Sequence, residues 1–407
     1  MSREYIRLGG LKVRKIPYPY RAMFAICSDL DETPDKEVYF EIMKFLNTES
    51  VTCMGKGVGL EIGNTIYFDM PEEQFSYWNS DDSGRTAVRA LMRAGFIDCI
   101  HSFGDDATDR SFAERAINEL KHHQCVIKVW VDHAQAITNI GGDIMEGYGD
   151  VPGHAAYHAD ILCDYGVKYF WRGRVTSVIG QNTGRGYGGL MNRHLLKSGL
   201  TLIKQIVKDA LGYFGSEKYA IHGKNNLLRP IVLRDGARVT EFIRCNPFWG
   251  GVDKSATADG ISEVLTERYF EKLVRSGGVS ILYTHLGKIK DRAEPFNKST
   301  REALFRLRRY SEAKTILVTT TFRLLEYSSF IDTAAISVEE KQGARVIYVE
   351  FDGSEKALQG FTVACESSIP HQLVLNGREP MAMVENSRSE DGEITYSVPW
   401  NRLEYPL

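Results

Sequence analysis

Two aspartates at the end of an apolar run are the first residues that suggest chemistry. The segment FAICSDLDET, residues 24–33, places Asp29 and Asp31 directly after a pattern typical of a buried strand. Alternate residues of a strand share a face, so both carboxylates are expected to point the same way, with Leu30 on the other side. Two like charges this close need a cation, a proton or a cationic partner. The alternative is a helix start, because an aspartate is a common N-cap ahead of Pro34.

His101 and Asp105 form a second candidate pair. They lie in IHSFGD after another apolar run, four residues apart. If a helix follows the strand at once, both side chains lie on one face and can reach one ion. A site of Asp, His and Asp with a position left for water suits zinc, and it also admits manganese, cobalt or nickel. The alternative is a buried core histidine and a helix-capping aspartate.

The same kind of residue recurs at other strand ends. Strands are predicted at 22–29, 96–101, 124–131, 167–171, 239–245, 278–284 and 314–319, and helices at 36–47, 85–94, 110–122, 154–165, 261–276 and 298–311. Strand ends carry Asp29, His101, Asp132, His133, Arg172, Arg174, Arg244, Asn246 and His285. Strands alternating with helices predict an α/β fold with a parallel sheet, curled into a complete or incomplete barrel, whose active site lies at the carboxyl ends of the strands.

Bulk composition narrows the class of protein. The chain has 407 residues, 43% of them hydrophobic, and a formal net charge of -3. No basic stripe stands out, so nucleic acid is not an expected partner. The start lacks a secretory apolar region and no stretch is long enough to span a membrane, which predicts a cytoplasmic protein. Seven scattered cysteines, none in CxxC spacing, are expected to be reduced thiols.

Three segments together resemble a known family. FAICSDLDET, IHSFGD and GVSILYTHLG are similar, in order and position, to motifs of the polysaccharide deacetylase superfamily, the nodulation-type carbohydrate esterases. The resemblance implies a distorted (β/α)7-type barrel that uses a divalent metal, zinc first, to remove acetyl groups from sugars. It implies that Asp29 is the general base, that Asp31, His101 and Asp105 hold the metal, and that His285 is the acid. An arginine would orient the base, with Arg172 the first candidate and Arg244 the second.

This chain departs from the family pattern in its first two motifs. Leu30 separates the two aspartates, Glu32 and Thr33 replace the usual Gly-Pro, and Asp105 stands where a second histidine ligand is usual. His133 is therefore a candidate replacement ligand.

The domain organisation is predicted in two parts. Residues 1–335 are assigned to the barrel, with an insertion at about 176–236, and residues 336–407 to a C-terminal antiparallel β domain of sandwich type. In the insertion, residues 195–214 form an amphipathic helix that either packs on the barrel or makes a peripheral membrane contact.

These observations together predict a metal-dependent hydrolase that removes an acyl group from an amino sugar or glycan precursor. Candidate substrate-binding residues are His133, Asn139, Arg244, Trp171 and Trp249. One alternative is a catalytically silent barrel that binds carbohydrate or scaffolds glycan assembly. Another is a glycoside hydrolase that uses two carboxylates, with Asp29 paired with Asp31 or Asp132. The sequence does not give the sugar or the oligomeric state.

Overall fold

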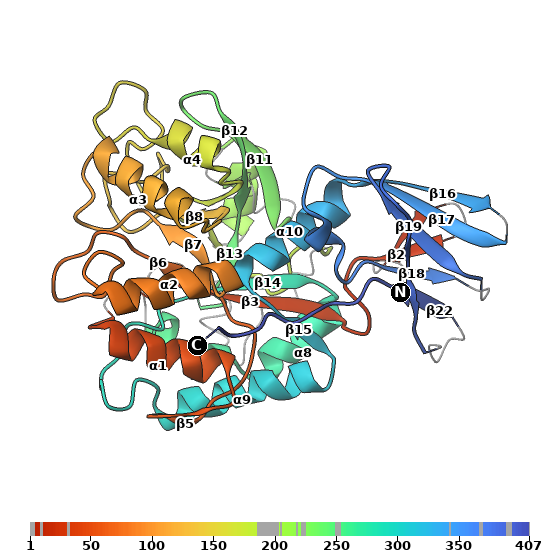
Figure 1. Ribbon diagram of the computed structural model, residues 1–407, viewed down its shortest axis with the longest axis horizontal. Helices are drawn as coiled ribbons and strands as arrows, with labels where there is room; N and C mark the ends of the chain where they lie inside the picture. The colour runs from red at the N-terminus through yellow and green to blue at the C-terminus, as the bar shows by residue number, and fades with distance from the viewer. Residues whose placement is uncertain are drawn as a thin grey trace.

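One large curled sheet forms the centre of the fold, with helices on its outer face and smaller sheets beside it (Figure 1). The structure is a computed structural model that describes residues 5–8, 11–30, 33–184, 203, 206–216, 219–220, 225–248, 254–341, 343–365, 369–387 and 393–406. The fold is mixed α/β, which confirms the class predicted from the alternation of elements.

The curled sheet contains eleven described strands in the order β10-β13-β14-β3-β6-β7-β8-β9-β12-β11, with β15 also paired to β3. Their bounds are β3 (Ala22–Ser28), β6 (Asn64–Ile66), β7 (Ile97–His101), β8 (Val129–Val131), β9 (Tyr169–Trp171), β10 (Val175–Thr176), β11 (Leu228–Val232), β12 (Arg238–Phe242), β13 (Arg244–Cys245), β14 (Val279–Thr284) and β15 (Ile316–Val318). Neighbours pair in parallel except β11 and β12. The carboxyl ends of the parallel strands therefore meet along one edge, called the rim below.

Helices follow the strands closely. They are α1 (Lys36–Asn47), α2 (Asp82–Ala94), α3 (Arg110–His122), α4 (Ala159–Tyr165), α7 (Ile261–Val264), α8 (Glu267–Ser276), α9 (Lys298–Glu312) and α10 (Thr321–Thr333). The predicted helix 261–276 is two helices, because Thr266 accepts a hydrogen bond from the backbone N–H of Tyr269 and caps a new start. β6, β11 and α10 lie outside the predicted ranges.

Strand alternation divides the apolar residues between two cores. Met23, Ala25 and Cys27 of β3 face the inside of the curled sheet, whereas Phe24 and Ile26 face the helices. The inside core also contains residues of α10. α10 crosses the amino ends of β7, β8 and β9, where it contacts Asp98, Lys128 and Lys168. The end of the sheet opposite the rim is therefore covered.

The sheet curls back toward its own edge near Ile243. β12 pairs with β9, and β13, which only Ile243 separates from β12, pairs with β14. The described strands give a curled half-barrel. A closed (β/α)7 barrel is not shown by their pairing, so that finer part of the prediction stays a prediction.

Three smaller sheets complete the described fold. The first contains β16 (Ala335–Lys341), β17 (Ala344–Glu350), β19 (His371–Leu375) and β20 (Met381–Ala382), and the second β1 (Tyr5–Leu8), β2 (Leu11–Arg14), β18 (Thr362–Cys365), β22 (Ile394–Ser397) and β21 (Val384–Glu385). The third is the antiparallel pair β4 (Val51–Thr52) and β5 (Gly55–Lys56). β2 pairs with β18, which corrects the assignment of the N-terminal strands to the barrel. The small sheets are antiparallel as predicted, except that β17 and β19 pair in parallel. Such pairings join segments far apart in sequence and leave no local signal.

The end of the chain returns from the small sheets to the helices of the large one (Figure 1). The backbone N–H of Leu403 donates to Glu61 Oε2 at 2.8 Å, and the rings of Tyr405 and Phe96 lie 5.3 Å apart. Across the described ranges, no helix has the length and apolar character needed to cross a membrane.

Candidate functional site

Alternate residues of a strand share a face, and this alternation brings the polar residues together at the rim. The residues that face the inside core continue past the strand ends with the same alternation. The inside core contains the strand residues Cys27, Cys99, Val131, Phe242 and Tyr283. Two positions after each of these stand, in the same order, Asp29, His101, His133, Arg244 and His285. With Tyr67, which follows β6, and Asp105, which follows β7, they are called the rim group below.

Asp29 and Arg244 form a buried ion pair at the centre of the rim group. Arg244 Nη1 lies 2.9 Å from Asp29 Oδ1 and 2.8 Å from Oδ2, and the two side chains are 0% and 2% exposed. Burial alone would raise the pKa of Asp29, but attraction to Arg244 and to two neighbouring histidines lowers it below its ordinary value. The guanidinium carbon lies 3.9 Å from the ring centre of Trp171. Asp29 is therefore an ionised carboxylate held in one orientation.

A histidine faces each oxygen of Asp29. His101 Nδ1 lies 3.8 Å from Oδ1, and His285 Nε2 lies 3.7 Å from Oδ2. The carbonyl oxygen of Asp132 accepts from His101 Nε2 at 3.2 Å, and that of Ala256 accepts from His285 Nδ1 at 3.2 Å. These bonds place the ring protons away from Asp29 and orient the other ring nitrogens toward it.

Burial lowers the pKa of His101 well below its ordinary value, although Asp29 acts in the opposite direction. His101 is therefore neutral at neutral pH. A neutral ring is the form in which a histidine accepts a proton or holds a metal.

His133, Asp105 and Tyr67 extend the rim group toward solvent. His133 Nε2 lies 3.1 Å from Asp105 Oδ1, and the Tyr67 hydroxyl lies 2.9 Å from His133 Nδ1 and 3.5 Å from His101 Nε2. The Tyr67 ring stacks on His101 at 4.4 Å. The hydrogen bond from His133 lowers the pKa of Asp105. The Asp105 side chain is 44% exposed and that of His133 is 13% exposed, so this is the accessible side of the group.

The backbone that follows β7 and β8 is strained. Ser102, Phe103 and Gly104 have φ of 47°, 66° and 113°, and Ala134 has φ of 40°. A Cβ on Gly104 would lie 1.9 Å from the Asp69 carbonyl oxygen, so only glycine fits there. No helix follows β7 directly, and the expectation that His101 and Asp105 share a helical face is wrong. Left-handed non-glycine residues are costly and concentrate at functional sites.

The arginine on Asp29 is Arg244, and Arg172 lies elsewhere. Arg172 Nε contacts Glu241 Oε1 at 2.9 Å, in a buried cluster that includes Arg229 and Arg174. Its place next to Trp171, which faces inside, turns Arg172 to the outer face. The first candidate for the orienting arginine is therefore corrected to the second.

Three residues predicted to touch substrate are buried by their own contacts. Trp171 lies beneath Arg244, and Asn139 accepts from the N–H of His133 at 2.9 Å and donates to its carbonyl at 3.1 Å. Both are 0% exposed, and so is Arg244. They position the rim group, and their contact with a substrate stays a prediction. Trp249, the remaining predicted substrate-binding residue apart from His133, lies outside the described residues.

Asp132 is also a structural residue. Its carboxylate accepts from Trp130 Nε1, Ile140 N and Gly141 N at 2.7–2.9 Å. Burial nevertheless raises its pKa to about 7. Three donors already bind its two oxygens, and its role as the partner of Asp29 in a two-carboxylate mechanism stays a prediction.

Only two of the three predicted metal ligands, His101 and Asp105, lie within the described residues. Asp31 lies outside the described residues, and within the described ranges no three His, Cys, Asp or Glu side chains form a metal-holding group. Of the remaining two ligands, His101 directs Nδ1 toward Asp29, and Asp105 contacts His133. The imidazole and carboxylate groups are of the type that zinc, manganese, cobalt and nickel accept.

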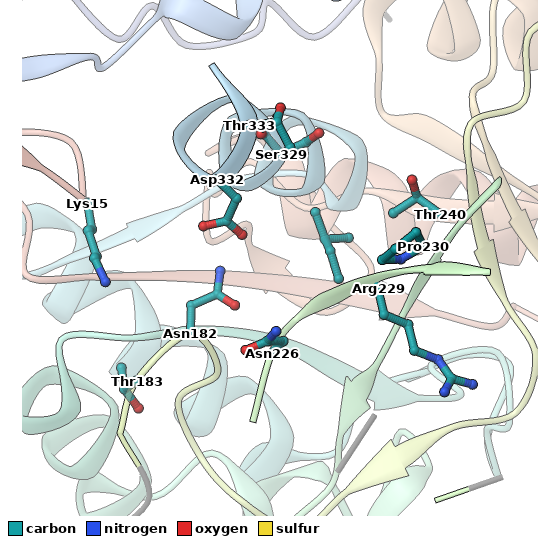
Figure 2. Close-up of a pocket in the computed structure, with 11 residues that line it drawn as sticks. Lys15, Asn182, Thr183, Asn226, Arg229, Pro230, Thr240, Ser329, Asp332 and Thr333 are labelled. Carbon is teal, nitrogen blue, oxygen red and sulfur yellow. Dashed lines mark hydrogen bonds between the residues drawn. The ribbon is translucent and has the colours of Figure 1, made fainter. Parts of the chain in front are cut away.

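A separate cavity of about 600 Å³ lies between α10, β11 and residues 182–183. Figure 2 shows Asp332 of α10 facing Asn182, with Lys15 at the side. Burial raises the pKa of Asp332, and Lys15 opposes that shift. Its described lining contains no member of the rim group.

Comparison of the chain with protein-family models, with curated proteins and with solved structures finds no match. The functional argument therefore rests on the rim group.

Proposed function

We propose that the chain is a hydrolase of the polysaccharide deacetylase type, which removes an acyl group from an amino sugar or glycan precursor. The observation that carries this proposal is Asp29, ionised by Arg244 and faced by a histidine at each carboxylate oxygen. An ion pair needed only for stability does not require two further titratable rings beside it. Acyl transfer to water requires this set of groups, a base and an acid held close together.

Asp29 is the proposed proton acceptor. Its lowered pKa keeps it ionised across the neutral range, so it is always ready to accept a proton, but it is also a weak base. A weak base removes a proton efficiently only from a water molecule that has been made more acidic. This requirement favours a metal-assisted reaction over one that uses Asp29 alone.

His101, Asp105 and Asp31 are the proposed metal ligands, with His133 as a replacement and zinc as the first candidate ion. A bound divalent metal would lower the pKa of water from about 16 toward about 7 and polarise the acyl carbonyl. The orientation of His101 Nδ1 and its neutral state support its part in this assignment. His133 and Asp105 would have to exchange their mutual contact for the ion.

His285 is the proposed proton donor to the departing amine or alkoxide. Its Nδ1 donates to the Ala256 carbonyl, so Nε2 holds no proton at the start and faces Asp29 Oδ2 at 3.7 Å. Nε2 would first take the proton that Asp29 accepts from water and then pass it to the departing group. Arg244 is a positioning residue, because it holds Asp29 and is itself 0% exposed. Asp105 and His133 lie at the accessible side, where the sugar would enter.

The proposal is tested by acetate release from N-acetylated and O-acetylated sugar oligomers, with zinc, manganese, cobalt or nickel added in turn. The wild-type protein is expected to release acetate, and Asp29→Asn to reduce the rate by about 10²–10⁴-fold, the usual contribution of a general base. Asp109→Asn, at the exposed cap of α3, is the matched control and is expected to keep full activity. Acetate release that is unchanged in Asp29→Asn, or absent with every metal, would overturn the proposal.

A further inference from the structure

A second cavity lies at the end of the curled sheet opposite the rim. Its volume is about 520 Å³, within the usual range for small-molecule sites. It is bounded by the end of α2, the segment before β8, the first turns of α10, the short helix η3 (Glu355–Leu358) and the returning C-terminal segment. The residues that line it all belong to fully described stretches.

The lining has a strong excess of positive charge. It contains Arg93, Lys128, Arg323, Lys356 and Arg402 but only one carboxylate, Glu326. The whole chain, by contrast, has a net charge of -3. Neither Lys128 nor Lys356 has a carboxylate partner among the described residues, whereas Arg323 is already bound to Glu61. Two ammonium groups in one concave site favour an anionic ligand.

Flat apolar surfaces accompany these charges. Phe322, Tyr327 and Trp400 line the cavity, and Val126 at its side is 63% exposed. Arg323 stacks over Trp400 with its guanidinium carbon 4.2 Å from the ring centre, and Lys128 Nζ lies 5.8 Å from the Phe322 ring. Aromatic and guanidinium planes bind flat rings by stacking.

Glu326, which lines the cavity, has one carboxylate oxygen without a donor among the described residues. Glu326 is 3% exposed, and its Oε1 contacts Lys168 Nζ at 3.1 Å and the Tyr169 hydroxyl at 3.3 Å. Its Oε2 is buried with no hydrogen-bond partner within the described part of the chain. A buried acceptor in this state is costly, and a ligand N–H or O–H group would satisfy it. Lys168 offsets the charge of Glu326, so this carboxylate does not exclude an anion.

We propose that this cavity binds a small organic anion that carries a flat ring and a hydrogen-bond donor. A nucleoside monophosphate has all three features and is the class chosen for the test. The inference is independent of the deacetylase proposal, because it uses no residue of the rim group.

The test is calorimetric titration of the full chain with adenosine 5′-monophosphate, adenosine and inorganic phosphate. Saturable binding of the monophosphate is expected, with weaker binding of adenosine and phosphate. The double variant Lys128→Gln/Lys356→Gln should weaken it by about tenfold or more, since it removes both of these ammonium groups from the cavity. Lys298→Gln, on exposed α9, is the matched control and should bind as the wild type does.

A second readout locates the bound molecule. The monophosphate should slow acetylation of Lys128 and Lys356 by an amine-reactive reagent, measured by peptide mass spectrometry, and leave Lys298 unaffected. Three results would overturn the inference: no saturable binding, equal binding of phosphate alone, or binding that the double variant does not change.

Discussion

Replacing Arg244 by methionine removes the cation that makes a buried Asp29 tolerable. The two groups meet at 2.8 and 2.9 Å and are 0% and 2% exposed, so solvent does not screen them. Unit charges about 4 Å apart at an effective dielectric of about 20 attract by about 4 kcal/mol. Breaking a buried pair by deleting one partner typically costs about 3–5 kcal/mol, because the other charge stays buried and uncompensated. We expect Arg244→Met to lower the free energy of unfolding by this amount at pH 7.

The pH dependence gives the prediction a second signature. In the wild-type protein the lowered pKa of Asp29 contributes stability above about pH 4, its unfolded pKa, and this contribution is lost as the pH falls through the folded pKa. In Arg244→Met, burial is no longer opposed by the arginine, so Asp29 should bind a proton more readily. The loss relative to the wild type should therefore shrink as the pH falls from 7 toward 4.

Urea unfolding of wild type, Arg244→Met and Arg244→Met/Asp29→Asn from pH 4 to 8 measures both effects. The double variant should recover part of the loss, because it removes the unpaired charge. Arg275→Met is the matched control: Arg275 is 74% exposed and 3.9 Å from Glu271, and its removal should change stability by less than about 1 kcal/mol. A loss in Arg244→Met as small as in this control, or one that does not depend on pH, would refute the reasoning.

Three further predictions follow from other buried or rim contacts. Burial raises the pKa of Asp98 to about 7, so Asp98 keeps its proton in the folded state between about pH 4 and 7, and its contribution to stability falls as the pH rises. Asp98→Asn should remove this dependence, which amounts to up to about 1.4 kcal/mol per pH unit in the free energy of urea unfolding. If the free energies of wild type and variant change with pH in the same way, the prediction is contradicted. Tyr67→Phe keeps the ring on His101 but removes the hydroxyl from His133, and should cost about 1 kcal/mol, whereas Tyr148→Phe, at a half-exposed ring, should cost nothing measurable. His133→Ala should raise the pKa of Asp105 toward its ordinary value in an NMR titration, because the hydrogen bond from His133 lowers it. An unchanged Asp105 titration would show that this contact does not form.

Much of the rim group could be predicted because buried strands show a two-residue alternation of apolar and polar residues in the sequence. Asp29, His101, His133 and His285 each end an apolar run, and their position two residues after an inside residue is a local property. The same rule turns Arg172 outward, because its neighbour Trp171 is inside. It does not assign Arg244, because the two residues before it, Phe242 and Ile243, both belong to the inside core.

Other features depend on contacts that a local pattern does not contain. β6 has only three residues, too few to show a period, so Tyr67 was missed although it touches both His101 and His133. The left-handed turn after His101 was not anticipated, because only Gly104 hints at it and the residues before it are not typical of that conformation. The pairing of β2 with β18 joins residues some 350 positions apart, and neither strand alone specifies its partner.

The most direct test of the proposed metal centre is the metal content of the purified protein beside His101→Ala, measured by elemental mass spectrometry after gentle desalting. The account predicts a near-stoichiometric divalent ion, zinc first, in the wild type and its loss in the variant. No metal in either protein, even after zinc, manganese, cobalt or nickel is added, would contradict the metal-assisted mechanism.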